Sequence, residues 1–341
     1  MATIGNSFYN LIDYYRSLAG NGESIEADVV EALATLKPAI GDAIATEANK
    51  GASHLHTIRS GLPTVTWGRL YRGIQQSKGS KTQVEDTTGF VEGRSEIDER
   101  LLQLTNNEAA VRMDEANGFL EALGQEVESG IFYNDTASTP EKFKGLAARY
   151  NTLGGGGAGN QVVNALGAGS DNTSIWFVTW GESQTTLIYP KGTKAGIERT
   201  DRGSQQVLDA GGLPYFAKVE EFRWHLGLAV RDWRYNARIA NIDLSDVQAG
   251  TVDLYKFMRK ASYKLQNRRT AKMNGDIAAQ GRTVIYMNRD MIEALDALGT
   301  NSGNGALMIR PMELEGKEVM SYRGLPIRET DALINAESLV S

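Results

Sequence analysis

The chain has 341 residues, of which 41% are hydrophobic and 23% are charged. This length predicts one large globular domain or two modest ones. The formal net charge of −6 disfavours a general nucleic-acid-binding protein, which normally carries an excess of basic residues. Because the chain contains no cysteine, disulfides, cysteine nucleophiles and thiolate metal sites are excluded.

The N-terminal residues indicate neither secretion nor membrane insertion. The stretch MATIGNSFYNLIDYYRSLAG lacks a basic region followed by an apolar run, and no stretch of the chain approaches about eighteen consecutive apolar residues. We therefore expect a soluble protein made in the cytosol. Residues 1–50 contain two short helical patterns, roughly at 8–18 and 25–46, with too little apolar surface to fold alone. We expect this arm to lie on its own chain or on a neighbour.

Residues 51–105 predict a long β-hairpin. The run LPTVTWGRLYRGI at 62–74 alternates as a strand does, with Trp67, Arg69 and Tyr71 on one face. A polar turn, QQSKGSKTQ, follows, and the chain then returns in an extended pattern. A projecting two-stranded ribbon is only marginally stable in water unless something packs on it. The hairpin therefore requires a partner.

The segment 106–129 has the clearest helical pattern. Its apolar stripe, at spacings of three and four, consists of Ala116, Phe119, Leu120, Leu123 and Val127. The acidic residues expected to face away are Glu108, Asp114, Glu115, Glu121, Glu126 and Glu128. Arg112 is the only basic residue of the segment. We expect a long helix that is apolar on one side and acidic on the other.

The rest of the chain mixes strand and helix patterns. Strand patterns lie at 174–181, 185–190, 216–229, 231–242, 282–288 and 318–334, the last interrupted at GLP. We expect the first two to form a hairpin. Helical patterns lie at 254–267 and at 289–299, where Gly299 ends the second. These elements predict an α+β protein with a mostly antiparallel sheet.

Candidates for catalysis and metal binding are weak. The run GGGGAG at 154–159 lacks the strand, helix and GK[ST] ending of a phosphate loop, which favours a flexible connector. His54 and His56 would share a strand face, but no carboxylate is placed near them, so a metal site is disfavoured. His225 lies in an aromatic strand pattern and is expected to be a sheet residue. We predict no catalytic, cofactor-binding or metal-binding residue.

One basic cluster stands out. Within seventeen residues and with no acid among them lie Lys256, Arg259, Lys260, Lys264, Arg268, Arg269 and Lys272. The cluster could form a nucleic-acid patch. A helix face that pairs with acidic surfaces, such as the 106–129 helix of another copy, is favoured because the whole chain is acidic. The arm, the unsupported hairpin and the oppositely charged helices all require partners, which a self-assembling protein supplies with copies of itself.

In the order of these elements the chain resembles the major capsid proteins of tailed bacteriophages, which have the Hong Kong 97 fold. The order is an N-terminal arm, an extended E-loop hairpin, a long spine helix, a P-domain sheet and an A domain. Two local stretches add to the resemblance. In IFYNDTASTPEKFKGLAARYN, a Phe-x-Gly-Leu follows a proline, as after the spine helix in many such coats. SYRGLPIRETDAL is similar to their late strand.

The resemblance implies a domain organisation for this chain. It comprises an N-terminal arm (1–50), an E-loop hairpin (51–105), a P domain with its spine helix (106–245) and an A domain (246–341). The last strand of the A domain would return toward the P domain. Residues 130–151 would leave the spine helix, with Phe132 and Tyr133 packing beneath it. The implied anchoring residues of this stretch are Phe132, Pro140, Phe143, Gly145 and Leu146. This stretch would then be a packing element, and a ligand-binding loop is the alternative.

The resemblance also implies a function. The chain would be a structural protein, not an enzyme, that forms hexamers and pentamers of an icosahedral head around double-stranded DNA. Its expected partners are other copies of itself, a separate scaffolding protein, a portal, a cement or decoration protein, and DNA through weak contacts, with no membrane. Assembly in the bacterial host cytoplasm would place the chain in the virion.

Several residues are candidates for contacts between subunits. They are Trp67, Arg69, Tyr71, Arg72, Lys78, Lys81, Glu115, Glu121, Arg259, Arg268 and Arg269. Lys78 and Lys81 lie near the predicted hairpin tip, but no acceptor is identified and we predict no covalent cross-link. Two other functions stay open from the sequence: an enzyme whose site forms only in the fold, and another phage structural component such as a decoration or connector protein.

Overall fold

The computed structural model describes residues 35–341, apart from residues 105–106, 210, 268–280, 302–308 and 315–316. The chain forms two compact units. Among the described residues, unit 1 comprises Thr35 and the ranges 90–127 and 194–225, and unit 2 comprises the ranges 36–89, 128–193 and 226–341. Three long elements have residues in both units: β3 (Ser80–Asp98), α4 (Glu108–Tyr133) and β8 (Pro214–Val230).

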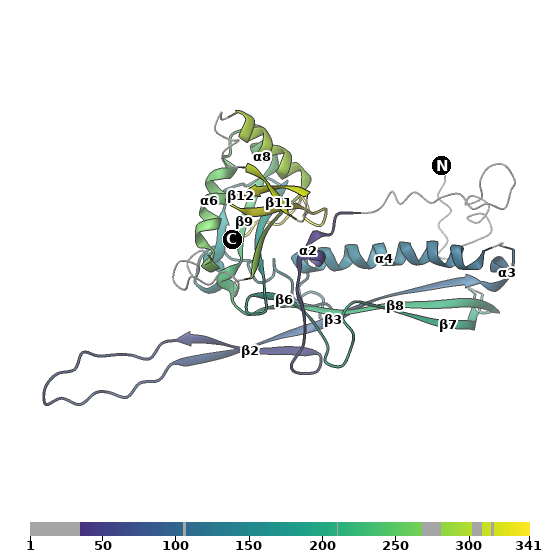
Figure 1. Ribbon diagram of the computed structural model, residues 1–341, viewed down its shortest axis with the longest axis horizontal. Helices are drawn as coiled ribbons and strands as arrows, with labels where there is room; N and C mark the ends of the chain where they lie inside the picture. Colours follow the sequence, from purple (N-terminus) through teal and green to yellow (C-terminus); the bar gives the residue numbers. More distant parts are fainter. Residues whose placement is uncertain (1–34, 105–106, 210, 268–280, 302–308, 315–316) are drawn as a thin grey trace. The chain divides into compact units, whose positions relative to one another are not determined.

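Unit 1 is a helix packed on three strands (Figure 1). Strand β8 lies between β3 and β7 (Ile197–Leu208), and it pairs with β7 in antiparallel register. The apolar stripe of α4 faces these strands, and Phe119 stacks on Phe222 with ring centroids 5.5 Å apart. Gly93 allows this close packing, because a Cβ there would lie 2.7 Å from the Phe119 ring. The short helix α3 (Glu99–Leu102) follows β3.

Helix α4 confirms the predicted long helix but ends later than predicted. It runs to Tyr133, four residues beyond 129, so Phe132 and Tyr133 form its last turn and do not pack beneath it. Gly130 lies inside the helix, where a Cβ would come within 3.2 Å of the Phe143 ring. Glu128, expected on the solvated face, is instead 1% exposed.

Unit 2 is built around the fully buried strand β5 (Asn172–Trp180), which pairs in antiparallel register with β9 (Ala237–Asp243) and β10 (Arg282–Met287). Beyond β10 lie β13 (Leu325–Glu329), β12 (Lys317–Tyr322) and β11 (Ile309–Leu314). Beyond β9 lies β4 (Val162–Asn164). Strand β6 (Thr185–Tyr189) pairs with β1 (Ala45–Glu47) and with the end of β8. Most neighbouring strands are antiparallel, as predicted, with parallel pairs β1–β6, β4–β9, β5–β6 and β10–β13.

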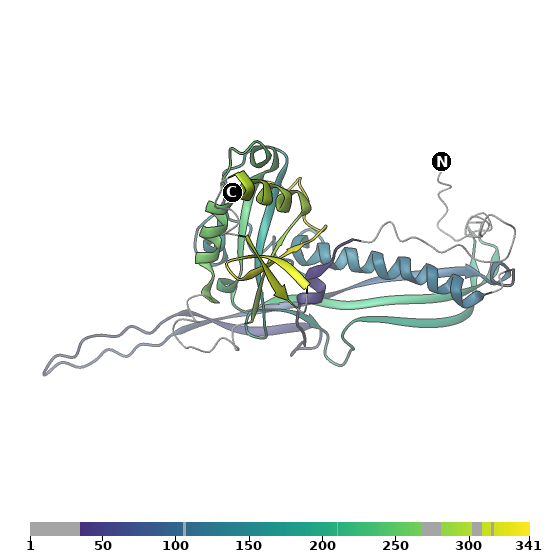
Figure 2. The ribbon, with the colours of Figure 1, turned by 45° about the horizontal axis from the view of Figure 1, so that its top comes forward.

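Three helices complete the core of unit 2: α5 (Leu244–Gln248), α6 (Leu254–Lys264) and α8 (Arg289–Asn301). Apolar residues of α6 and α8 pack on β5, β9 and β10 in one buried cluster, which Figures 1 and 2 show as helices beside the sheet. Each of α5 and α6 begins after an aspartate whose side chain accepts a backbone N–H of the first turn. None of the described helices is both long and apolar enough to cross a membrane.

Three predictions outside the hairpin of residues 51–105 are wrong. The strands at 174–181 and 185–190 do not form a hairpin, because β5 pairs on both sides with strands distant in sequence and touches β6 only at Trp180 and Thr185. The strand predicted at 231–242 begins only at Ala237, after a short 3-10 turn at Trp233–Tyr235. Where the predicted helix at 25–46 is described, it is one turn, α2 (Pro38–Asp42), followed by β1. Proline starts a helix well but is unfavourable inside one.

The predicted hairpin of residues 51–105 is present, but its strands differ from the prediction. Strand β2 (Ser53–Gly61) pairs with β3 from Ser53↔Thr87 to Gly61↔Ser80. Residues 62–79, which we call the hairpin loop, contain no strand, so the strand predicted at 62–74 is wrong. Figure 1 shows this loop extended beyond β2 with no other element of unit 2 beside it. An alternating sequence needs a hydrogen-bonded neighbour to become a strand, and unit 2 provides none there.

Candidate assembly surfaces

The hairpin loop exposes large apolar side chains. Trp67 is 98% exposed, and the least exposed of the set, Ile74, is 76% exposed. The full set is Leu62, Val65, Trp67, Leu70, Tyr71 and Ile74. Contiguous exposed apolar surface of this kind marks a site of interaction in soluble proteins. Tyr71 also has a positive φ of 63°, which is rare for a residue with a bulky side chain.

The same stretch is strongly basic. Between Arg59 and Val84 the sequence contains no acidic residue, and its basic residues are Arg59, Arg69, Arg72, Lys78 and Lys81. We call Arg69, Arg72 and Lys78, which lie in the hairpin loop, the loop cations; Arg59 and Lys81 lie on the flanking strands β2 and β3. All five are exposed, and none forms an ion pair within the part of the chain that the structure describes. The hairpin loop therefore offers apolar and cationic groups together, and the described residues neither cover the first nor pair with the second.

The base of the hairpin is firmly held, in contrast to its loop. Asp86 on β3 is 4% exposed and lies between the Arg149 guanidinium, at 2.8 Å, and the backbone N–H of Val230, at 3.3 Å. Arg149 also donates to the carbonyl of Leu228 at 2.8 Å. Gly89 permits a further close approach, because a Cβ there would lie 2.8 Å from the Glu141 carbonyl oxygen. This buried ion pair fixes the base of the hairpin on the sheet of unit 2.

His54 and His56 lie at this base. Their ring centroids are 6.3 Å apart, and His56 Nδ1 is 3.8 Å from Asp86. Burial lowers the pKa of His56, with Arg149 and Arg231 acting in the same direction and Asp86 opposing them. Burial also lowers the pKa of His54. Among the described residues, no group of three potential metal ligands occurs.

His225 and the glycine run are the two other sequence features that were considered for chemistry. The surroundings of both indicate a structural role. The His225 ring packs against Phe90 with centroids 5.5 Å apart. In the glycine run, the residues from Gly154 to Gly157 all have positive φ, and the run leads through a 3-10 turn into strand β4. A phosphate loop would instead lead into the N-terminus of an α-helix.

The acidic candidates on α4 already have partners in unit 1. Glu121 accepts hydrogen bonds from the backbone N–H of Thr35, at 3.0 Å, and from the Gln125 amide. Glu115 is half-buried and has its own interactions. Arg112, the one basic residue, is paired with Asp201 at 2.6 Å and with the buried carboxylate of Glu220. These side chains stabilise unit 1 itself.

The outer face of the three strands of unit 1 is also charged, and its charges are paired. We call this surface the paired face; it consists of Glu92, Arg94, Glu96, Arg202, Glu221 and Arg223. Arg94 lies 2.7 Å from Glu96, Arg202 lies 2.7 Å from Glu221, and Arg223 is bonded to Glu92. Hydrogen bonding to Arg202 lowers the pKa of Glu221. Each arginine of this face has a carboxylate on its own chain.

The basic cluster is divided between described and undescribed residues. Arg259 is exposed on α6 together with Lys256 and Lys260, whose ammonium groups lie 5.8 and 5.5 Å from the centre of the Phe257 ring. Lys264 donates to the carbonyl of Asn160, and burial lowers its pKa. Arg268 and Arg269 lie outside the described residues.

The stretch after α4 closes the end of that helix. Backbone N–H groups of Gly145, Leu146 and Ala147 donate to the carbonyls of Asn134, Ile131 and Phe132, at 2.7–2.9 Å. Helix ends otherwise leave such carbonyls unsatisfied. At Gly145 a Cβ would lie 2.7 Å from the Gly130 carbonyl oxygen, so the chain could not approach this closely with any other residue.

The side chains expected to anchor this stretch differ in burial. Phe132 and Leu146 are fully buried, and Phe143 is 4% exposed. Pro140 is exposed, which does not fit the anchoring role expected of it. The contacts described for the stretch, three backbone hydrogen bonds to the end of α4 and three buried apolar side chains, are those of a packing element.

Sequence reasoning missed two buried carboxylates that tie distant segments together. Glu128 accepts the N–H groups of Ala39 and Ile40, each at 3.0 Å, and burial raises its pKa. Glu337 pairs with Arg238 at 2.7 Å and accepts the Tyr133 hydroxyl at 2.5 Å. These partners are separated by about 90 to 200 residues along the chain. No local pattern could have identified them.

Comparison with known proteins places this geometry in a family. The sequence profile of a family described as major capsid protein GP7 matches residues 20–341. A chain from a near-atomic structure of bacteriophage epsilon15 is 33% identical, with 100% of this chain and 99% of that chain covered and a TM-score of 0.76. A search of curated proteins finds no match.

Two further solved structures show weaker similarity. One is an encapsulin complex from Synechococcus elongatus, with 11% identity, coverage of 70% of this chain and 96% of that one, and a TM-score of 0.45. The other is the capsid of a native GTA particle, with 10% identity, coverage of 67% and 96%, and a TM-score of 0.44.

The match to the epsilon15 chain extends over the whole of this chain, so the two share one mixed α and β architecture, the Hong Kong 97-like capsid fold. The family profile covers most of the sequence as well. An exposed apolar and cationic loop on a firmly held hairpin suits a subunit that assembles with copies of itself. From these matches, the chain belongs to the major capsid protein GP7 family and has a capsid-forming structural role in a phage virion.

Proposed function

We propose that this chain assembles into hexamers and pentamers that close an icosahedral head around double-stranded DNA, and that the hairpin loop of each copy docks on a neighbouring copy. The observation that carries the proposal is the hairpin loop. Six large apolar side chains are exposed on it, beside cations without ion-pair partners in the described chain. The part of unit 2 that the structure describes offers no surface to cover them.

The energetics favour many modest contacts. Burying one large apolar side chain stabilises a contact by about 2 kcal/mol, and part of that offsets the ordering of the loop. Repeated over every copy in a closed shell, contacts of this size give a stable particle whose single interfaces remain reversible. The loop cations add attraction to an acidic surface, which fits a chain with net charge −6.

The other contact candidates have supporting roles in this proposal. The exposed cations of α6, with Arg259 among them, pair with acidic surface on a neighbouring copy, and Arg268 and Arg269 extend the same basic cluster. Glu115 and Glu121 hold α4 in its own unit and contribute less to contacts between copies. Phe132, Phe143, Gly145 and Leu146 fix the exit from α4, so that the hairpin base keeps its position.

The domain roles and partners are also proposals. Residues 1–50 act as an arm, 51–105 as the E-loop, 106–245 as the P domain and 246–341 as the A domain. A separate scaffolding protein, a portal and a cement or decoration protein complete assembly in the host cytoplasm. The chain performs no catalysis. Its acidic balance keeps contact with packaged DNA weak, so that the genome can slide during packaging.

Shortening the loop tests the proposal. Gly61 and Ser80 are cross-strand neighbours, so residues 62–79 can be replaced by Asn-Gly, which closes a two-residue hairpin turn. We expect the shortened chain to fold with an unchanged circular dichroism spectrum and unfolding midpoint. Negative-stain microscopy should show closed shells for the full chain with its scaffolding partner, and none for the shortened chain. Closed shells from the shortened chain would contradict the proposal.

A further inference from the structure

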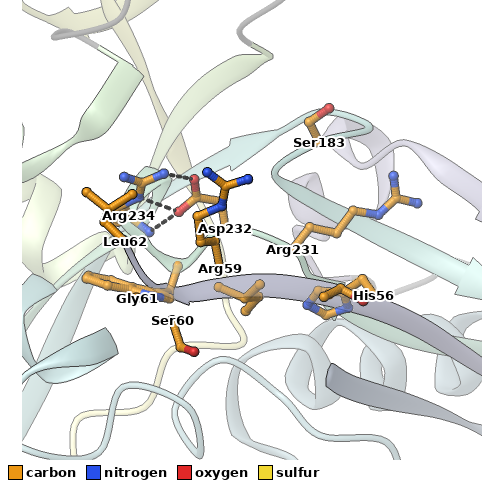
Figure 3. A pocket seen from close by; sticks show the side chains of 12 residues that line it. His56, Arg59, Ser60, Gly61, Leu62, Ser183, Arg231, Asp232 and Arg234 are labelled. Atoms are coloured by element: carbon orange, nitrogen blue, oxygen red, sulfur yellow. Dashed lines mark hydrogen bonds and ion pairs between the residues drawn. The ribbon is translucent and has the colours of Figure 1, made fainter. Parts of the chain in front are cut away.

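A pocket of about 760 Å³ lies at the base of the hairpin in unit 2. One wall is the outer part of β2, from His56 to Gly61, together with Leu62. The opposite wall is made by Ser183 and by the chain from Arg231 to Arg234, between β8 and β9. Figure 3 shows His56 and Arg231 toward one end of this pocket, and Arg59, Asp232 and Arg234 toward the other.

The charges that line the pocket do not cancel. Three arginines and one aspartate are present. Asp232 is fully engaged by Arg234, whose guanidinium lies 2.9 and 2.7 Å from its two carboxylate oxygens. This pair leaves Arg59 and Arg231 as two cations without a carboxylate partner within the described chain. A pocket with this excess attracts an anion.

Several polar atoms here lack ordinary hydrogen-bond partners. Neither ring nitrogen of His56 makes a hydrogen bond, although its side chain is only 10% exposed. The Nε of Arg231 is also buried and unpartnered, while another N–H of its guanidinium donates to the carbonyl of Glu182. Leaving buried donors without partners is unfavourable, so a bound acceptor would be stabilised.

We propose that this pocket binds an oxyanion, a phosphate or a carboxylate group, at its Arg231 end, where His56 and Ser183 are further donors, and that Arg59 attracts the anion from the other end of the pocket. Guanidinium groups present N–H donors in a fixed fork that matches the oxygens of either group. Ser183 is exposed on the opposite wall and can donate its hydroxyl. The site is a property of the single subunit, so the inference goes beyond assembly and does not depend on it.

The charge on His56 would couple binding to pH. Burial lowers its pKa, as do Arg149 and Arg231, while Asp86 raises it. His54 is the other titratable group close to its ring. A bound anion favours the protonated ring, so binding takes up a proton and strengthens as the pH falls. Sulfate is the suitable probe for this test, because its charge is constant across the range.

Histidine-selective NMR of the full chain tests the site directly, because the sequence contains only three histidines. We expect inorganic phosphate to shift the His56 signal to saturation, compared with chloride at equal ionic strength. The His225 signal, from unit 1, should stay in place. Sulfate should bind more tightly at pH 6 than at pH 8. A His56 signal that does not move, or that moves equally with chloride, would overturn the proposal.

Three variants sharpen the test. Arg231→Gln should weaken phosphate binding by about tenfold or more, the loss expected for one charged hydrogen-bond donor. Arg59→Gln removes an exposed side chain of the same pocket, so it should weaken binding while leaving the fold intact. Lys78→Gln removes an equal charge from the hairpin loop outside the pocket and should bind as wild type. Equal losses in all three variants would show attraction to net charge alone and would overturn the site.

Assembled particles identify the source of the oxyanion. Equilibrium dialysis with labelled phosphate would compare unassembled subunits with closed shells. Loss of binding on assembly shows that a carboxylate of a second copy occupies the pocket. Retained binding shows that free phosphate occupies it. Phosphate binding by subunits in which no shell forms would support the pocket and count against the proposed assembly, so the two proposals can fail separately.

Discussion

The paired face of unit 1 and the hairpin loop of unit 2 are both rich in arginine and lysine, but their counter-charges differ in origin. On the paired face, Arg94, Arg202 and Arg223 each contact a glutamate of the same chain. The loop cations form no ion pair within the described chain, and their apolar neighbours are exposed. The first surface is complete in one copy, whereas the second requires another molecule.

This difference indicates where the free energy of assembly resides. A surface whose charges are already paired gains little from a charged partner, because each new contact must replace an existing one. A surface with exposed aromatic groups gains from every side chain that it buries. We therefore expect changes in the hairpin loop to alter assembly without altering folding, and changes in the buried contacts to alter folding first.

The largest expected effect is on assembly. Changing Trp67 and Tyr71 together to serine removes two fully exposed aromatic side chains, so the unfolding midpoint should not change. The concentration needed for assembly should rise by about 100-fold or more, since each aromatic ring contributes about 2 kcal/mol when buried. Light scattering across a concentration series measures the threshold.

The matched control lies in the same loop. Changing Gln75 and Gln76 to serine alters two exposed polar residues and should leave the threshold near that of wild type. An equal rise in both double variants would mean that any change in the hairpin loop disturbs assembly. That result would contradict a specific role of Trp67 and Tyr71 in assembly.

The second effect is on folding. Phe143→Ala removes a ring that is 4% exposed and packs against Gly130. The cavity should lower the free energy of unfolding by about 3–5 kcal/mol, as measured by urea denaturation, and should reduce soluble yield and particle formation together. Pro140→Ala, an exposed change in the same stretch, should have little effect. A Phe143→Ala protein as stable as wild type would remove the basis for calling this stretch an anchor.

The comparison also shows what could be predicted from the sequence. The long helix, the hairpin and the α+β class follow from local patterns and are confirmed by α4, by β2 with β3 and by the matched fold. The strand expected at 62–74 has the right alternation but lacks the neighbour that would complete its hydrogen bonds. Alternation describes which side chains share a face, and it cannot supply a partner from another copy.

Pairing between strands that are distant in the sequence explains the other wrong predictions. Strand β5 is buried along its whole length and pairs with strands that lie about 60 and 110 residues later. A short turn after β5 therefore suggested a hairpin that does not form. The Asp86–Arg149 ion pair that holds the hairpin base joins residues 63 positions apart. Such a pair depends on the completed fold, so the pocket beside it could not be anticipated.

We expect the two histidines at the hairpin base to make the stability of the protein depend on pH. Burial lowers the pKa of both His54 and His56 below the usual 6.5. As the pH falls below 6.5, these two rings bind more protons in the unfolded chain than in the folded chain. The stability contributed by the neutral rings is therefore complete above that pH and is lost toward the lower folded pKa.

A double variant measures this contribution. The urea midpoint of wild type should fall between pH 7.5 and pH 5.5 by more than that of His54→Gln/His56→Gln. Both proteins share every other titrating group, so the difference between their pH profiles isolates the two rings. If the two pH profiles ran parallel, His54 and His56 would not contribute to the pH dependence of stability. Their pKa values would then not be lowered by burial.

The smallest expected effect separates the two charged surfaces most directly. Arg202→Gln breaks one ion pair of the paired face, with Glu221 left exposed to water, so neither the unfolding midpoint nor the assembly threshold should change measurably. Arg72→Gln removes a cation of the hairpin loop that has no ion-pair partner in the described chain. It should leave the unfolding midpoint unchanged but raise the assembly threshold, and more so at low salt, because screening weakens the charge contact in wild type at high salt. If Arg202→Gln raised the threshold as much as Arg72→Gln, the paired face would also contact another copy, and pairing within one chain would not mark a surface as complete.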